Sequence, residues 1–374
     1  MKIAYLYDCV YPYAIGGVER RVFELARRLS KKGHEVHLFG MKYWEGKPTL
    51  EHDGVFLHGV CPAGSLYSDG KRTVKPAVSY AWHILTPLLR EKFDIIDAQQ
   101  FPYLHCFPAK ASSVIKRTPL VITWHEVWGD YWHQYLLRWG FFGKSIEWGV
   151  SRLSQNMVAV SPSTARSLHS LGFANEITLI PNGIDCSHID AVPPSSLTSD
   201  IIFAGRFIGE KNVDLVIGAL DLLRRENPDV RAVIIGDGPK KSSLYRMVRD
   251  LNLGKHVTFT GFLDDPDEVI ALMKASKVFV FPSVREGFGM AALEAMACGV
   301  PVVTVDHPRN ATTDLVTPET GVITSLSPRS VSAAIQTCLQ DRSRFNEACR
   351  MKAKNYDWES IVGRTERYYA SVMR

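Results

Sequence analysis

The chain has 374 residues, of which 46% are hydrophobic and 22% are charged, and its formal net charge is +5. This composition is typical of a soluble globular enzyme of one large or two ordinary domains, and it excludes a disordered or fibrous chain. The mild positive charge comes without a basic run or a nucleic-acid-binding signature, so nucleic acid is not an expected partner.

Strand and helix patterns alternate along the first half of the chain. The first helical pattern runs from about Val18 to Lys32 and ends at Gly33. Strands are expected at 3–7, 35–39, 94–98, 120–124, 157–160 and 177–180. Such alternation predicts a parallel sheet that is covered by helices.

A Pro- and Ser-rich stretch at 190–198 predicts a linker. The alternation then restarts, with strands expected at 201–204, 232–235, 257–260, 278–281 and 302–305. The predicted fold is therefore α/β, with two doubly wound Rossmann-like domains, 1–190 and 199–357, facing each other across a cleft. The final segment, 358–374, has a helical pattern.

The chain carries no membrane or secretion signal of the usual kind. No apolar run reaches about 18 residues, and the N-terminal residues form a strand pattern. The seven cysteines are odd in number and never close neighbours. We therefore expect reduced thiols in the cytoplasm and no zinc site.

Two candidate site segments follow expected strands of the first domain, where doubly wound sheets bind their ligands. Gly16 and Gly17 open the first helix, which suits a phosphate or a closely approaching acceptor, although paired glycines also form plain turns. They are not a Gly-x-Gly-x-x-Gly fingerprint, which weakens a dehydrogenase interpretation. His125 follows the strand at 120–124, although a lone His is more often structural.

A third candidate segment follows the strand at 201–204 and begins at Gly205. It carries Arg206, which can form bidentate hydrogen bonds with phosphate oxygens, and Lys211, which supplies a compact positive charge. This pair predicts an anion site, and two solvated surface cations are the alternative. Glu210 is interpreted as a neighbour of a base or ribose, or as a residue that orients Lys211.

The most informative stretch joins the strand at 278–281 to a helix that begins at Met290. Gly287 and Gly289 let the backbone approach a ligand, and the start of the helix directs free N–H groups and the positive end of its dipole toward it. We therefore expect an anion there. Glu294 lies on a helix that is otherwise apolar, so its carboxylate needs hydroxyl or amide partners.

Glu286 lies eight positions before Glu294, on the loop instead of the helix. The two carboxylates are expected to contact different parts of one elongated ligand, such as a sugar that is joined through phosphates to a ribose. With Phe281-Pro282-Ser283 before it and Gly287-Phe288-Gly289 within it, this stretch resembles the Glu-x7-Glu motif of retaining nucleotide-sugar glycosyltransferases of family 4. That family has the two-domain GT-B fold.

The resemblance spans nearly the whole chain and is weakest at 41–118. Further matches to the family lie at 16–19, 181–185, 205–211, 236–239 and 261–263. The resemblance implies that Glu286 bonds hydroxyls of the donor sugar, that Glu294 bonds the ribose, and that His125 lies beside the donor sugar. It also implies that the helix at 358–374 crosses back onto the first domain. Donor contacts, many of them through backbone, are implied for Gly16, Gly17, Gly205, Glu210, Gly236, Phe262, Gly287, Phe288, Gly289, Met290 and Ala291.

The resulting prediction is a retaining, metal-independent hexosyltransferase. It would need no cofactor and would move a sugar from a UDP- or GDP-linked donor to a hydroxyl of a glycan or lipid-linked acceptor, with Arg206 and Lys211 offsetting the charge of the leaving diphosphate. A sugar-nucleotide epimerase or phosphorylase of the same fold and a catalytically silent nucleotide-sugar-binding protein are the alternatives.

The sequence Asp265-Pro266-Asp267 also spells the metal-binding Asp-x-Asp motif of the other large transferase fold. However, Asp265 precedes Pro266 and an apolar-periodic run, which predicts a helix N-cap.

Five of the eight tryptophans lie between Trp124 and Trp148, interleaved with Tyr, Phe and basic residues. Such a cluster is either ordinary domain core or an interfacial segment that rests at lipid headgroups. The first interpretation is favoured. The second predicts a peripheral contact of 124–152 with anionic membrane at the cytoplasmic face.

Overall fold

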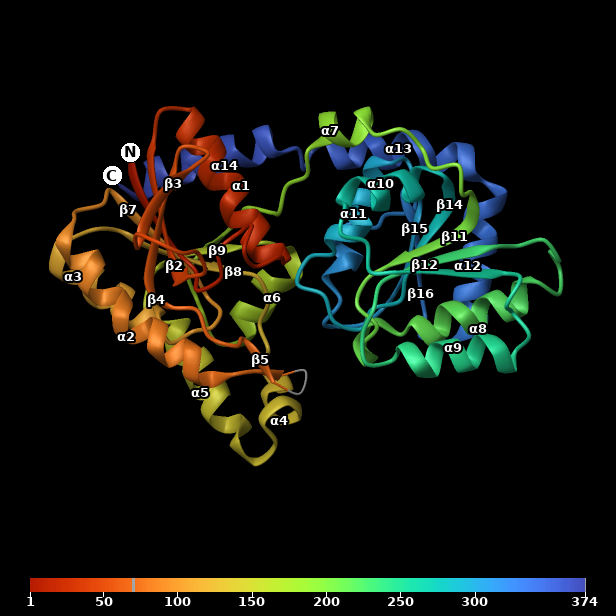
Figure 1. The fold of residues 1–374 in the computed structure, drawn as a ribbon, viewed down its shortest axis with the longest axis horizontal. Coiled ribbons are helices and arrows are strands. Elements are labelled where there is room, and N and C mark those ends of the chain that lie inside the picture. The colour runs from red at the N-terminus through yellow and green to blue at the C-terminus, as the bar shows by residue number, and fades with distance from the viewer. Residues whose placement is uncertain (69–70, 374) are drawn as a thin grey trace. The chain divides into compact units, whose positions relative to one another are not determined.

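The computed structural model describes residues 1–68 and 71–373, and its contacts divide the chain into two compact units (Figure 1). One unit consists of residues 1–182 and 358–374, and the other consists of residues 183–357. The second unit is therefore inserted into the first one. The stretch expected to link the domains, 190–198, lies inside the second unit.

An eight-stranded sheet in the order β10-β9-β8-β7-β1-β2-β4-β3 forms the centre of the first unit. All neighbouring strands are parallel except β3 and β4, which form an antiparallel pair at the edge. The strands are β1 (Lys2–Leu6), β2 (Glu35–Lys42), β3 (Thr49–His52), β4 (Val55–Pro62), β7 (Ile95–Gln99), β8 (Leu120–Trp124), β9 (Asn156–Ala159) and β10 (Ile177–Leu179). The short strands β5 (Tyr67–Ser68) and β6 (Lys71–Arg72) pair separately.

Helices cover both faces of this sheet, as its buried apolar strands require. Figure 1 shows α1 and α14 on one side and α2, α3 and α5 on the other. Leu29, Trp358 and Tyr369 belong to the apolar cluster of the first side, whereas Tyr80 and Trp132 belong to that of the second. The helices are α1 (Gly17–Lys31), α2 (Val74–Arg90), α3 (Cys106–Lys116), α4 (Tyr131–Leu136), the 3-10 turn η1 (Leu137–Trp139), α5 (Gly140–Val150), α6 (Pro162–Ser170) and α14 (Trp358–Val372).

The second unit contains a six-stranded, fully parallel sheet in the order β13-β12-β11-β14-β15-β16. Its strands are β11 (Ser199–Ala204), β12 (Ala232–Ile235), β13 (Val257–Gly261), β14 (Ser276–Phe281), β15 (Val302–Val305) and β16 (Gly321–Thr324). The four central strands are almost entirely buried, because helices lie on both faces.

Figure 1 places α10, α11 and α13 on one side of this second sheet and α8, α9 and α12 on the other. The helical segments are α7 (Cys186–Ala191), η2 (Gly209–Lys211), α8 (Val213–Leu223), α9 (Lys241–Asp250), α10 (Pro266–Lys274), α11 (Met290–Ala297), η3 (Ala311–Asp314), α12 (Pro328–Gln340) and α13 (Arg342–Lys354). The predicted α/β class, with two doubly wound Rossmann-like units, is therefore confirmed.

Candidate active site

The strand order of the second sheet reverses between β11 and β14, which pair with each other. Doubly wound sheets bind ligands at such a switch point, outside the carboxyl ends of the strands. The loop after β11 carries Arg206 and Lys211, and the loop after β14 carries Glu286. The fold thus places these three predicted site residues on two neighbouring loops.

Lys211 and Glu286 form an ion pair, and their side chains are only 15% and 14% exposed. The ammonium group of Lys211 also lies 4.6 Å from the centroid of the Phe281 ring. Arg206 lies on the same loop as Lys211 and is exposed. A cation and a carboxylate are thereby held side by side, and a second cation is free to meet solvent or a ligand.

Hydrogen bonds between the two loops hold this pair in place. The backbone N–H of Val284 donates to the carbonyl of Glu210 at 2.9 Å. The amide group of Asn212 donates to the carbonyl of Pro282, also at 2.9 Å. Glu210 therefore joins the loops through its backbone, and the carboxylate paired with Lys211 belongs to Glu286.

A third loop, which sequence reasoning missed, supports Glu286. The N–H of Glu286 donates to the carbonyl of Arg309 at 2.8 Å, and its carbonyl accepts from the N–H of Ala311 at 2.9 Å. Between them, the buried Asn310 donates to the carbonyl of Val305 at 2.8 Å. The sequence could have indicated this loop through Asn310, a polar residue shortly after the strand at 302–305, where doubly wound sheets bind ligands.

Gly289 is the N-cap of α11 and has a φ of 100°. A Cβ atom there would lie 2.5 Å from the hydroxyl oxygen of Thr312, so both the backbone conformation and the space favour glycine. The N–H groups of the first turn of α11 and its dipole suit an anion. Met290, Ala291 and Glu294 are partly exposed on this helix, whereas Ala292, Leu293, Ala295 and Met296 are buried.

The carboxyl ends of β11, β12 and β13 meet on the other side of the switch point. A Cβ atom at Gly236 would lie 1.9 Å from the carbonyl oxygen of Gly205, so the two backbones touch. Phe262, directly after β13, is 65% exposed. Phe288 is buried instead, with its ring edge-on to Tyr356, so only its backbone is available to a ligand.

The predicted N-cap at Asp265 is confirmed. Its carboxylate accepts from the N–H of Asp267 at 2.9 Å, and Pro266 is the first residue of α10. The carboxylate of Asp267 lies 2.7 Å from Nε2 of His188 on α7.

In the first unit, the two predicted glycines differ in their surroundings. Gly16 is the N-cap of α1, and a Cβ atom there would lie 2.4 Å from a carboxylate oxygen of Glu19. Gly17 is exposed, and a Cβ atom there would meet nothing within 4 Å. A side chain at position 16 would displace only the end of the Glu19 side chain, whereas Gly17 leaves open space above the start of the helix.

His125 follows β8 and is held by two glutamines, one that ends β7 and one that directly follows it. Its N–H donates to the side-chain oxygen of Gln100 at 3.0 Å, and its Nε2 lies 2.8 Å from the side-chain oxygen of Gln99. The amide nitrogen of Gln99 donates to Asp97, which turns its oxygen toward His125. His125 Nε2 therefore carries a proton. Burial, assisted by Arg21, holds the pKa of His125 well below its usual value, so the ring is neutral.

The buried Asp97 connects this histidine to the C-terminal helix. Its carboxylate accepts from the hydroxyl of Thr123 at 2.8 Å and from that of Tyr369 on α14 at 2.5 Å. Burial raises the pKa of Asp97 above its usual value. Sequence reasoning missed Asp97, Gln99 and Gln100, whose signal was a set of polar side chains at the end of an apolar strand.

An apolar pocket of about 240 Å³ lies beside the loops that follow β7 and β8. Its walls are mostly apolar and include Phe101, Trp128, Trp132, Tyr135 and Ile146. Behind them, the fully buried carboxylate of Glu147 accepts from the N–H groups of Trp128 and Gly129 at 2.8 Å each. This carboxylate therefore fixes the loop that carries the pocket wall.

The tryptophan cluster is divided between core and surface. Trp124 and Trp132 are buried and Trp128 is partly buried, whereas Trp139 and Trp148 are each 53% exposed. Within residues 1–68 and 71–373, none of the helices is sufficiently long and apolar to cross a membrane.

Two family models match consecutive parts of the chain. Residues 15–188 match the model described as Glycosyltransferase Family 4, and residues 194–358 match the model described as Glycosyl transferases group 1. Glycogen synthase of Mycobacterium tuberculosis is 27% identical over 97% of this chain and 93% of its own length. The GDP-mannose-dependent alpha-(1-6)-phosphatidylinositol dimannoside mannosyltransferase of the same species is 31% identical over half of each chain.

Solved structures have the same fold. Sucrose-phosphate synthase of Thermosynechococcus elongatus superposes with a TM-score of 0.82 at 21% identity, covering 99% of this chain and 98% of that one. HepE of Anabaena, in complex with UDP and glucose, superposes with a TM-score of 0.73 at 21% identity, covering 99% of this chain and all of that one. From the two matched models and this shared fold, the chain belongs to the GT-B glycosyltransferases of the family 4 type.

Proposed function

We propose that this protein is a retaining glycosyltransferase. It moves the sugar of a UDP-sugar or GDP-sugar to a hydroxyl of a glycan or lipid-linked acceptor. The observation that carries the proposal is the arrangement at the switch point of the second unit. The paired Lys211 and Glu286 lie there with Arg206 on the adjoining loops.

The second unit would hold the donor. Arg206, Lys211 and the N-terminus of α11 provide positive charge for a diphosphate whose negative charge grows as the sugar leaves. Glu286 accepts hydrogen bonds from the sugar hydroxyls and Glu294 from the ribose. HepE of Anabaena, which has been solved in complex with UDP and with UDP-glucose, supports a donor of this class.

The chemistry we propose needs no cofactor and no metal ion, because the cations of the protein supply the countercharge. The departing phosphate oxygen takes the proton of the attacking hydroxyl on the same face of the sugar. The work of the protein is then to position the reactants and to stabilise charge. The neutral His125, held by Gln99 and Gln100, is proposed to lie beside the donor sugar.

The apolar pocket of the first unit supports an acceptor with an apolar part. It opens beside the loops that follow β7 and β8, where acceptor groups are expected. Its volume is smaller than that of sites that enclose a whole ligand. The pocket is therefore suited to hold only the apolar part of a larger acceptor. A peripheral membrane contact through 124–152 belongs to the same proposal. The seven free cysteines support a cytoplasmic location.

The proposal is tested by melting the full chain with UDP-, GDP- and ADP-sugars. A ligand that binds only the folded state raises the melting temperature. One donor class should do so, and that donor should then be consumed only when an acceptor is added. Consumption without an acceptor would indicate an epimerase or a hydrolase, and no stabilisation by any nucleotide sugar would reject the donor site.

A further inference from the structure

Large apolar side chains are exposed on three helical segments of the first unit: α2, α3, and η1 together with α5. Of the 21 large apolar side chains that are exposed in the described part of the chain, eleven lie between Val74 and Trp148. On α2, Val74, Val78 and Trp82 repeat every four residues, which places them on one face of the helix. Trp82 is 81% exposed. Clustered exposed apolar side chains indicate an interaction site, whereas scattered ones do not.

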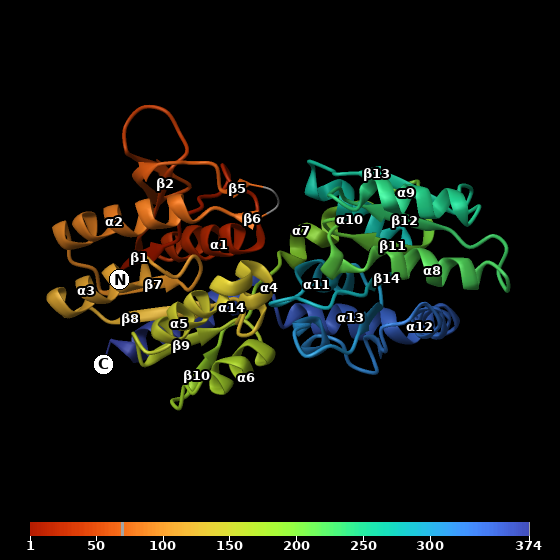
Figure 2. The ribbon, with the colours of Figure 1, turned by 90° about the horizontal axis from the view of Figure 1, so that it is seen from below.

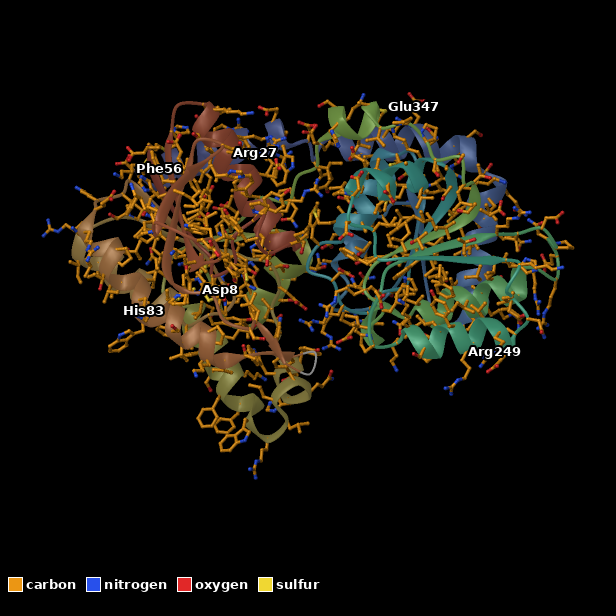
Figure 3. The ribbon with its side chains drawn as sticks, in the orientation of Figure 1. Asp8, Arg27, Phe56, His83, Arg249 and Glu347 are labelled. Carbon is orange, nitrogen blue, oxygen red and sulfur yellow. The ribbon has the colours of Figure 1, made fainter. Side chains whose placement is uncertain are left out.

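The three segments are neighbours, and Val74 of α2 and Phe142 of α5 line the same pocket. Helices α2 and α3 pack against each other, and Figure 2 shows them with α5 in the first unit. Phe107 of α3 and Phe141, Phe142 and Trp148 of α5 line one open groove of about 690 Å³. Figure 3 labels His83, the exposed neighbour of Trp82 on α2. We name this surface the aromatic face and define it by Val74, Val78, Trp82, Phe107, Leu137, Trp139, Phe141, Phe142 and Trp148.

The charges of the same segments are nearly all positive. From α2 to α5, the helices carry six Lys and Arg side chains: Lys75, Arg90, Lys110, Lys116, Arg138 and Lys144. Their one acidic side chain is Glu147, which is fully buried. Lys144 pairs with the exposed Asp130 just before α4. An excess of positive charge therefore surrounds the exposed apolar side chains.

Two of the exposed indoles lie beside guanidinium groups. Arg138 lies over the ring of Trp139 at 5.2 Å, and Arg152 lies over the ring of Trp148 at 4.1 Å. The guanidinium of Arg152 also donates to the carbonyls of Leu171 and Gly172, so Arg138 is the better placed of the two to meet lipid phosphate. An aromatic ring beside a cation suits the headgroup region of a bilayer, where the ring is partly buried.

We infer that the aromatic face docks on a membrane surface that contains anionic lipids. The inference rests on the proposed function, because such a surface would present a lipid-linked acceptor to the first unit. It widens the predicted contact at 124–152 to include α2 and α3. A symmetric dimer through this face would instead bring like charges together, which disfavours a second copy as the occupant.

The test is cosedimentation of the full chain with vesicles of phosphatidylcholine alone or mixed with phosphatidylglycerol. The protein should bind the mixed vesicles at about 50 mM salt and much less at about 500 mM salt, where the charges are screened. The triple variant Trp82→Ala/Trp139→Ala/Trp148→Ala should reduce binding by roughly tenfold or more, since it removes most of the insertable apolar surface. Brominated lipids should quench the tryptophan emission of the wild type but not that of the variant.

Matched variants make the test specific. Tyr245→Ala/Ile323→Ala/Met351→Ala removes three exposed apolar side chains from the second unit and should leave vesicle binding unchanged. Lys75→Gln/Lys110→Gln/Arg138→Gln should weaken binding to the mixed vesicles while the protein stays folded.

The inference is overturned if the wild type stays in solution with mixed vesicles at low salt. It is also overturned if ultracentrifugation finds a dimer that the tryptophan variant converts to a monomer. Stabilisation by a nucleotide sugar, measured on the same samples, separates the two proposals. Donor binding without vesicle binding rejects only the membrane face, whereas vesicle binding without donor binding rejects only the proposed transferase.

Discussion

At the scale of single residues, Lys211 and Glu286 depend on each other, because both are largely buried and each neutralises the other. We expect Glu286→Gln to lower kcat by roughly 10²-fold while donor binding persists, since the carboxylate serves the sugar in the transition state. Lys211→Met should weaken both donor binding and transfer, because its ammonium group contacts phosphate in the ground state and in the transition state alike. Donor titrations by thermal shift and steady-state kinetics measure the two effects.

The exposed Lys255 provides the control for this pair. Lys255→Met removes the same charge from the second unit, at a position outside the two site loops, and should leave both quantities unchanged. Wild-type activity in Glu286→Gln would reject the assignment of Glu286.

His125 should make the stability of the fold depend on pH. Its folded-state pKa lies below the unfolded value of about 6.5, so the unfolded chain binds more protons at this ring in mildly acidic solution. Its contribution is present above pH ~6.5 and is lost as the pH falls toward the folded pKa. Asp97 and Glu147 have raised pKa values, so their contributions to the free energy of unfolding are instead lost as the pH rises.

We therefore expect the free energy of unfolding to fall less steeply with decreasing pH in His125→Gln than in the wild type. Urea unfolding between about pH 5 and pH 7.5 measures the difference, and the comparison cancels the groups that both proteins share. Parallel pH profiles would mean that the ring is not held neutral.

At the scale of elements, the start of α11 depends on one glycine. Gly289→Ala forces a left-handed backbone on a residue with a Cβ, at a cost of about 1–2 kcal/mol, and places that atom against Thr312. The variant should melt at a lower temperature and bind the donor more weakly. An unchanged melting temperature together with an unchanged donor affinity would show that the backbone at Gly289 is not constrained.

Gly17→Ala at the start of α1 is the contrasting substitution. The new methyl group meets nothing in the protein, and alanine favours a helix over glycine by about 1 kcal/mol. Stability should therefore be kept or slightly raised. A loss of transfer without a loss of stability would indicate that a ligand uses the space above Gly17.

Helix α14 supports the first unit through Tyr369, whose hydroxyl donates to the buried Asp97. Tyr369→Phe should cost about 1–3 kcal/mol of unfolding free energy, because it leaves a buried carboxylate with one partner fewer. Tyr245→Phe, on an exposed ring of the second unit, is the control and should change stability little. Denaturant unfolding of the two variants decides whether α14 acts through this bond.

The elements that sequence patterns predicted best are the buried parallel strands. The ranges 120–124, 232–235 and 302–305 coincide with β8, β12 and β15, because a strand covered on both faces is a continuous apolar run. The pair β3 and β4 was missed, since β3 lies exposed at the sheet edge and lacks such a run. Within the Pro-rich stretch predicted as a linker, Ser195 donates its N–H to the carbonyl of Ala271 in the second unit.

At the scale of the whole molecule, the sequence predicts the loops of the candidate site but not which side chains pair within them. Lys211 and Glu286 are 75 positions apart and belong to different strand-end loops, so their pairing depends on β11 lying next to β14. Gln99 and His125 meet for the same reason, because β7 pairs with β8. Such neighbours follow from strand order, which a single sequence does not encode locally.

Treatment with EDTA should leave transfer largely intact. Arg206, Lys211 and the N-terminus of α11 offer the countercharge that a divalent ion supplies in metal-dependent transferases. The measurement is the initial rate before and after chelation, with Mg²⁺ or Mn²⁺ added back. Activity that is abolished and then restored by the ion would contradict metal independence.

The insertion of residues 183–357 into the first unit has a consequence for synthesis on the ribosome. The chain emerges from its N-terminus, so the second unit is complete before α14 has been made. Until then, the first sheet lacks Trp358, Ile361 and Tyr369, which fill one of its two apolar clusters. The unit translated first is therefore the last to close, and limited proteolysis of a released chain that ends at residue 357 should cut the first unit while sparing the second.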